Sequence, residues 1–256
     1  MPVGLTTAML QIALQHPGRF VHHGRPMRLV IASWLLVAAV ACSIGAASPL
    51  AASAARADNG VSSMTPAQIL AQVKKDVAGA KSVHVFGSGT TGGQKIALDL
   101  KLVKDRGGAG HLAEGGVAFD IIRIGPTAYF RGDQKFWSHF TKSSGLAQLF
   151  AGKWLSASAT KGDLASFTPL TDISALTNQI LASPGALEKG PTTTVNGKPA
   201  VEVIEKTGGG VLYIATSGPA YPLLIKPGKG GTGEINFGDW NKPVALAKPA
   251  KSIAYH

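Results

Sequence analysis

The spacing of hydrophobic residues changes at Gly79, and the change separates a helix from a series of strands. Before this point, Ile69, Val73 and Val77 follow one another at intervals of four and therefore share one face of a helix over 65–79. Beyond it, apolar and polar residues alternate, which is the period of a half-buried strand. The sequence thus predicts an amphipathic helix followed by a sheet on which it packs.

Alternation of this kind recurs along most of the remaining chain. The middle, 141–185, interrupts it with two short helices, near 146–150 and over 173–181, and an extended piece at 153–155. Asn196-Gly197 lies between two alternating runs and is a strong hairpin signal. The predicted strands cover 83–85, 96–102, 117–124, 128–130, 192–195, 200–204, 211–215, 223–225 and 234–237.

The order of these elements predicts the fold class. Helix, strands, helices and strands in succession indicate an α+β protein with a meandering antiparallel sheet, because the elements do not alternate as strand–helix–strand units. Such a sheet has one apolar face, and the central helices are its natural cover. Large apolar residues between Phe130 and Trp154 fit a plain core, and they also fit an apolar cavity between a curved sheet and short helices.

The beginning of the chain has the pattern of an export signal. The apolar run Leu29–Ala41 follows Arg25 and Arg28, and it is shorter than the ~20 residues that a membrane-spanning helix needs. A basic start, a short apolar run and small residues at its end are typical of a secretory signal peptide. Translation begins either at Met1 or at Met27, and the pattern is compatible with both.

The only cysteine of the chain follows this run directly. Ala39-Val40-Ala41-Cys42 resembles a lipobox, in which the thiol is acylated and the cysteine becomes the first mature residue, although Ala39 replaces the usual leucine. Ordinary signal cleavage after small residues and an uncleaved anchor are the alternatives. The expected organisation is a signal peptide (1–41), a lipidated Cys42 with a flexible tether (42–63) and an exported domain (64–256). Acylation would anchor this domain to the outer face of the cell membrane.

Composition and charge narrow the range of partners. The formal net charge is +11, and +8 of this lies beyond residue 41, so the sequence favours an anionic partner such as an acidic membrane surface. The lysines are scattered singly, and no aromatic-rich strand carries interleaved basic residues, so nucleic acid is not an expected partner. A single cysteine excludes a disulfide framework within the chain and a cysteine-based zinc cluster.

The motifs that suggest catalysis or cofactor binding are weak. Gly87–Gly92 has the GxGxxG spacing of a dinucleotide-binding loop, but the residues after it alternate as a strand, and the motif requires a helix there. We therefore predict a hairpin loop at this point. His111 and Glu114 form a two-residue metal motif without a third ligand nearby in sequence. No catalytic signature is present, so we expect a protein that is not an enzyme and that holds no cofactor or metal.

Several short stretches together resemble the actinobacterial LppX/LprAFG lipoproteins, which share a fold with the carriers LolA and LolB. The resemblance extends from about Thr65 to Trp240 and rests on a set of stretches spread through the domain. These are 82–87, 94–100, 122–130, 152–154, 196–201, 212–215 and 221–223. It implies a half-barrel sheet wrapped over helices, and therefore that 64–256 is a LolA-like lipid-binding domain.

The same resemblance implies a function. We expect an envelope lipoprotein that binds the acyl chains of lipids or glycolipids, such as palmitate, in its apolar cavity and carries or presents them. The alternative is an envelope sensor or structural protein that uses this fold to bind a protein partner. The residues expected to line the cavity are Ile96, Leu98, Leu100, Leu102, Val117, Phe119, Ile121, Phe130, Leu149, Phe150, Trp154, Leu176 and Ile180.

Overall fold

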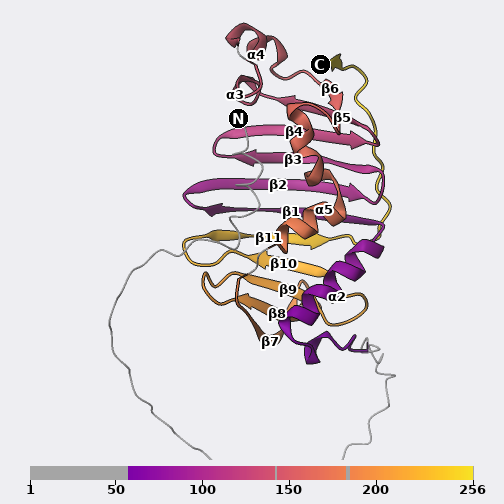
Figure 1. Ribbon diagram of the computed structural model, residues 1–256, viewed down its shortest axis with the longest axis vertical. Helices are drawn as coiled ribbons and strands as arrows, with labels where there is room; N and C mark the ends of the chain where they lie inside the picture. The colour runs from indigo at the N-terminus through magenta and orange to yellow at the C-terminus, as the bar shows by residue number, and fades with distance from the viewer. Residues whose placement is uncertain (1–56, 142, 183–184, 256) are drawn as a thin grey trace, which may run out of the picture. The chain divides into compact units, whose positions relative to one another are not determined.

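One open sheet dominates the structure (Figure 1). The computed structural model describes residues 57–141, 143–182 and 185–255. The strands are β1 (Ser82–Thr91), β2 (Gln94–Val103), β3 (Gly107–Glu114), β4 (Val117–Ile124), β5 (Thr127–Gly132), β6 (Leu155–Ser158), β7 (Leu187–Val195), β8 (Lys198–Glu205), β9 (Val211–Ala215), β10 (Pro222–Lys226), β11 (Thr232–Gly238) and β12 (Ile253–Ala254). Their order across the sheet is β12-β6-β5-β4-β3-β2-β1-β11-β10-β9-β8-β7. The pairing of β12 with β6 is parallel, and the other neighbours are antiparallel.

The principal helices lie against one face of this sheet (Figure 1). The helices are η1 (Val61–Ser63), α2 (Pro66–Gly79), α3 (Gln134–Ser138), α4 (Ser144–Phe150), η2 (Asp163–Thr171) and α5 (Ile173–Ile180). α2 begins with a capping box, in which the Thr65 side chain accepts from the Gln68 backbone N–H and the Gln68 side chain accepts from the Thr65 N–H. Asp172 caps α5 by accepting from the Ala175 N–H at 2.8 Å. The α+β class predicted from the sequence is therefore confirmed.

The register of the strands determines which side chains face the helices. Leu98 on β2, Leu112 on β3 and Phe119 on β4 are directly paired, and paired residues of antiparallel strands point to the same side. Leu100 and Ile121 lie in the next such row, on either side of Gly110. We call this side the helix face. The alternating residues of β2 and β4 therefore point to the same side of the sheet. Leu98 of β2 lines a pocket with Leu176 of α5, the helix that both strands were expected to face, whereas Phe119 of β4 packs against Phe136 and Phe167.

The predicted hairpin turn includes only the last glycine of the GxGxxG motif. Gly87 and Gly89 lie within β1, and the turn to β2 comes at Gly92 and Gly93. Gly87 has a φ of 153°, and a Cβ there would lie 2.1 Å from the backbone oxygen of Glu234. Glycine is therefore required because β11 approaches β1 closely. The strand continues directly into β2, so no helix follows the motif.

The end of the predicted flexible tether is part of the folded domain. Asn59 donates through Nδ2 to the Ala215 oxygen at 3.0 Å and to the Gly218 oxygen at 2.8 Å. Val61 is completely buried in the core. Residues 58–63, assigned to the tether from the sequence, therefore pack on the domain, where the Asn59 backbone N–H also donates to the Thr216 oxygen and Lys189 Nζ donates to the Ser62 oxygen. Cys42 and the predicted signal peptide lie outside the described residues.

Candidate functional site

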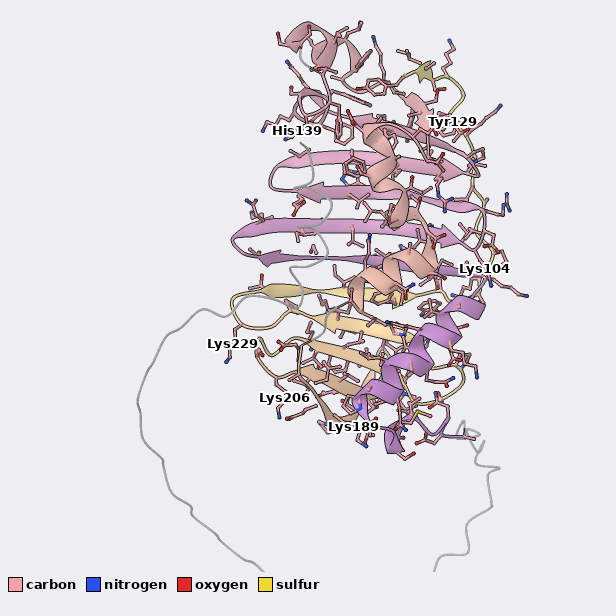
Figure 2. All side chains as sticks on the ribbon, in the orientation of Figure 1. Lys104, Tyr129, His139, Lys189, Lys206 and Lys229 are labelled. Atoms are coloured by element: carbon pink, nitrogen blue, oxygen red, sulfur yellow. The ribbon has the colours of Figure 1, made fainter. Side chains whose placement is uncertain are left out.

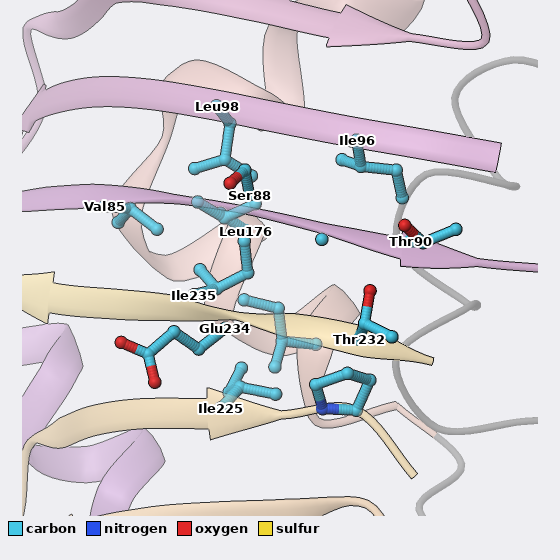
Figure 3. Close-up of a pocket in the computed structure, with 13 residues that line it drawn as sticks. Val85, Ser88, Thr90, Ile96, Leu98, Leu176, Ile225, Thr232, Glu234 and Ile235 are labelled. Atoms are coloured by element: carbon cyan, nitrogen blue, oxygen red, sulfur yellow. The ribbon is translucent and has the colours of Figure 1, made fainter. Parts of the chain in front are cut away.

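An apolar pocket lies between α5 and the centre of the sheet (Figure 3). Leu176 and Ile180, one turn apart on α5, face Leu98 and Ile96 on β2 across it. The volume of the pocket is about 90 Å³. Its lining consists of Val85, Ser88, Gly89, Thr90, Ile96, Leu98, Leu176, Ile180, Ile225, Pro227, Thr232, Glu234 and Ile235. The side chains that project into the pocket are mainly aliphatic, because Ser88, Thr90, Thr232 and Glu234 alternate with the helix-face residues of β1 and β11 and border the pocket through their backbone.

The pocket lies where β1 contributes no side chain at two successive positions of the helix face, Gly87 opposite Leu98 and Gly89 opposite Ile96. Gly89 is paired with Ile96 on β2 and with Gly233 on β11. A Cβ at Gly89 would lie 2.2 Å from the backbone oxygen of Thr232, so the strands leave no space for a larger residue. Neighbouring side chains therefore surround the space above this glycine without filling it.

Several of the aliphatic residues around the pocket are incompletely covered. Ile96, Leu98, Ile180 and Ile235 are half-buried, whereas Leu176 is buried. Apolar side chains that line a hollow and keep part of their surface accessible gain free energy when an apolar ligand covers them. The lining can therefore bind a hydrocarbon group without any charged contact.

Four of the expected lining residues, Ile96, Leu98, Leu176 and Ile180, meet at this pocket. Others of the list lie on the same helix face but are buried in the main core: Leu100, Leu102, Phe119, Ile121 and Phe130. Val117 and Phe150 pack against the edge of that core. Leu149 is 52% exposed on α4, and the ring of Trp154 lies 4.8 Å from the Arg131 guanidinium carbon. None of these nine residues lines the pocket.

Aromatic rings occupy much of the space under the central helices. The ring centroid of Phe119 lies 4.8 Å from that of Phe136 and 5.0 Å from that of Phe167. Phe167 belongs to η2, which the sequence did not predict, and it is 2% exposed. Because these rings pack against one another, the region near Phe119 is solid core, and the hollow lies farther along the sheet, over β1 and β11.

Nine of the thirteen lining residues are not among those expected from the sequence. Val85, Ile225 and Ile235 lie on β1, β10 and β11, and each is part of a predicted strand. The missing information was the pairing of β1 with β11, in which Val85 lies opposite Phe237. This pairing joins segments far apart in the chain, and local periodicity does not reveal it.

The histidines take part in local polar contacts on the sheet and its loops. His111 contacts Asp120, with 2.9 Å between Nδ1 and Oδ1, on the face opposite to the helix face, whereas Glu114 lies on the helix face. The two residues therefore cannot share a metal ion. Within the described ranges, no group of three His, Cys, Asp or Glu side chains is arranged to hold a metal.

Two buried polar atoms have no hydrogen-bond partner among the described residues: Glu114 Oε2 and Trp137 Nε1. Glu114 is 8% exposed, and it lies directly opposite Ile96 of the pocket. Burial raises the pKa of its carboxyl group above the ordinary value. A buried carboxylate without a partner is costly, so this side chain is a candidate for contact with a ligand.

The basic residues do not gather in one place. Lys104, Lys189, Lys206 and Lys229 are spread around the margin of the sheet (Figure 2). None of the described helices is both long and apolar enough to span a membrane.

The described residues thus form an open, mostly antiparallel α+β sheet with helices on one face and an apolar pocket between them. No protein-family model and no curated protein matches the chain. Among solved structures, the chain is similar to LprF from Mycobacterium bovis at 16% identity and a TM-score of 0.46, over 73% of this chain and 97% of that one.

Two further solved structures are similar at comparable levels. LppX from Mycobacterium tuberculosis is 16% identical with a TM-score of 0.43, over 71% of this chain and 99% of that one. The MucA/MucB complex from Pseudomonas aeruginosa matches at 14% identity and a TM-score of 0.34, over 72% of this chain and 59% of that one. The lipoprotein group that the sequence resembles is thus among the matches found by structure.

Proposed function

We propose that this protein binds the acyl chain of a lipid in the pocket between α5 and the sheet. The observation that carries the proposal is the aliphatic lining, in which Ile96, Leu98 and Ile180 remain half-buried. Each methylene group transferred from water to such a site contributes about 0.8 kcal/mol, so a long chain can bind without charged contacts.

The pocket must widen before it can hold a whole chain. Its volume of about 90 Å³ is below the roughly 300–1,000 Å³ typical of small-ligand sites. The sheet is a continuous hydrogen-bonded ladder here, whereas α5 is a helix of 8 residues that contacts it through side chains. We therefore assign the opening movement to α5.

The sequence supports an envelope location for this activity. The signal-like run and Cys42 suggest an exported lipoprotein that is anchored through its acylated cysteine. In that setting, the protein carries or presents lipids or glycolipids next to the membrane, and its net charge of +11 favours contact with an anionic membrane surface.

The test is extraction of the native ligand. The full chain is expressed in an actinobacterial host and purified, the protein is extracted with organic solvent, and the extract is analysed by mass spectrometry. We expect the extract to contain a lipid in stoichiometric amount. The covalent acyl groups on Cys42 stay with the protein and therefore do not contribute to the extract. Absence of any such lipid, together with failure to bind added palmitate, would contradict the proposal.

A second candidate function, binding of a protein partner, is favoured by an exposed apolar pair on α4. Leu146 and Leu149 are 46% and 52% exposed and lie three residues apart, so both are on the solvent side of the helix. If this pair binds an envelope protein, Leu146→Glu and Leu149→Glu should abolish the complex and leave lipid content unchanged. The pocket variant Leu98→Trp should have the opposite effect.

A further inference from the structure

The helix face of the sheet contains one carboxyl group whose position the core does not explain. Glu114 ends β3, is 8% exposed, and its Oε2 has no hydrogen-bond partner among the described residues. Its paired neighbours on the two adjacent strands are Ile96 and Val117, which are both apolar and cannot compensate a charge. An apolar residue at this position would pack without this cost.

The location connects this carboxyl group to the pocket. Ile96, which lines the pocket, lies directly opposite Glu114, and such pairs have Cβ atoms about 5 Å apart. A hydrocarbon chain over Leu98 and Ile96 that extends toward β3 therefore brings its polar end to Glu114. Oε2 has no donor among the described residues, so a hydrogen-bond donor on the ligand satisfies it, and a cationic donor also favours the ionised form that burial disfavours.

We infer that Glu114 is a specificity-determining residue of the pocket, selecting lipids whose polar end donates a hydrogen bond, as an ammonium or hydroxyl group does, over lipids that end in a carboxylate. The inference rests on the proposed function, since it assigns the polar end of the same ligand. It explains why the protein retains an unpartnered carboxyl group at a buried position.

The experiment compares two probes of equal chain length, hexadecylamine and palmitate, on the full-length protein. Affinities are measured by displacement of an environment-sensitive apolar dye. We expect the wild type to bind the amine more tightly than palmitate by about tenfold or more, the scale of one charge-assisted hydrogen bond. Glu114→Gln should reduce this ratio toward one, mainly by weakening the amine.

A second variant tests the same carboxyl group through stability. Glu114→Leu should raise the melting temperature of the ligand-free protein, by about 3 °C or more, because it removes an unpartnered buried carboxyl group. The same variant should lose the preference for the amine. A merely structural role predicts the reverse, a less stable protein with unchanged preference.

Asp99 supplies the matched control. It lies on β2 between Leu98 and Leu100, but its side chain is on the face opposite to the helix face, where its Oδ1 lies 2.8 Å from His84 Nε2. Asp99→Asn should leave the ratio nearly unchanged. The inference is overturned if Glu114→Gln keeps the wild-type ratio, or if Asp99→Asn alone abolishes it. If the wild type binds neither probe, the proposed function itself fails.

Discussion

Replacing Leu98 by tryptophan should fill the pocket and abolish lipid binding while the fold is retained. Leu98 is half-buried and lines the pocket from β2, beside Ile96 (Figure 3). The substitution keeps an apolar side chain on a strand position that tolerates aromatic residues. Because part of the leucine surface is open to the hollow, the larger ring has a space to enter, and we expect a loss of stability of at most about 1–3 kcal/mol.

The magnitude follows from the size of the hollow. The pocket has a volume of only about 90 Å³. The tryptophan side chain has six more non-hydrogen atoms than the leucine side chain and therefore occupies much of this space. If it keeps even three methylene groups of a ligand out, the loss is about 2.4 kcal/mol, or roughly fiftyfold in affinity.

The assay measures the lipid that co-purifies with the protein and the affinity for palmitate, with circular dichroism as the check on folding. The control is Ala97→Trp, which places the same ring on the same strand but on the face that the helices do not cover. Lys101→Ala, a surface change on β2, should also bind normally. If Leu98→Trp folds and retains as much lipid as the wild type, the pocket is not the binding site and our reasoning is refuted.

Three further outcomes are expected. Ile180→Ala should enlarge the pocket and raise palmitate affinity, at a cost in unfolding free energy of about 1–2 kcal/mol because the residue is only half-buried; an unchanged affinity in a folded variant would argue against this lining. Burial alone would raise the pKa of Glu205, but the backbone N–H groups of Gly208 and Thr207 outweigh it and lower the pKa below the ordinary 4.5. The carboxylate therefore stabilises the fold above about pH 4.5, so Glu205→Gln should lower the unfolding free energy by about 1–2 kcal/mol at neutral pH, and urea titrations should show this deficit shrinking as the pH falls. Cys42→Ala should move the protein from the detergent phase to the aqueous phase in phase partitioning, and unchanged partitioning would favour an uncleaved anchor.

The parts of the fold that the sequence predicts are those with strong local periodicity. The helix over 65–79 and the strand over 96–102 are observed as α2 and β2, because their apolar stripes are built from consecutive repeats. β3 was not predicted, since its sequence Gly-Gly-Ala-Gly-His-Leu-Ala-Glu has a single large apolar residue, Leu112. Its neighbours β2 and β4 supply the periodicity, and β3 is held between them by backbone hydrogen bonds.

The candidate site was only partly predictable, and the reason lies in how a hollow forms. Periodicity identifies the side chains that face the helices, and it correctly places Leu98 and Phe119 on one face. It does not show that Phe136 and Phe167 fill the space over Phe119, or that Gly89 leaves a space beside Leu98. A helix-face position lies in the core or in the pocket according to whether residues distant in the chain fill the space over it. The residues that distinguish the two here are therefore a glycine, which provides no side chain, and Glu114, whose buried Oε2 has no hydrogen-bond partner among the described residues.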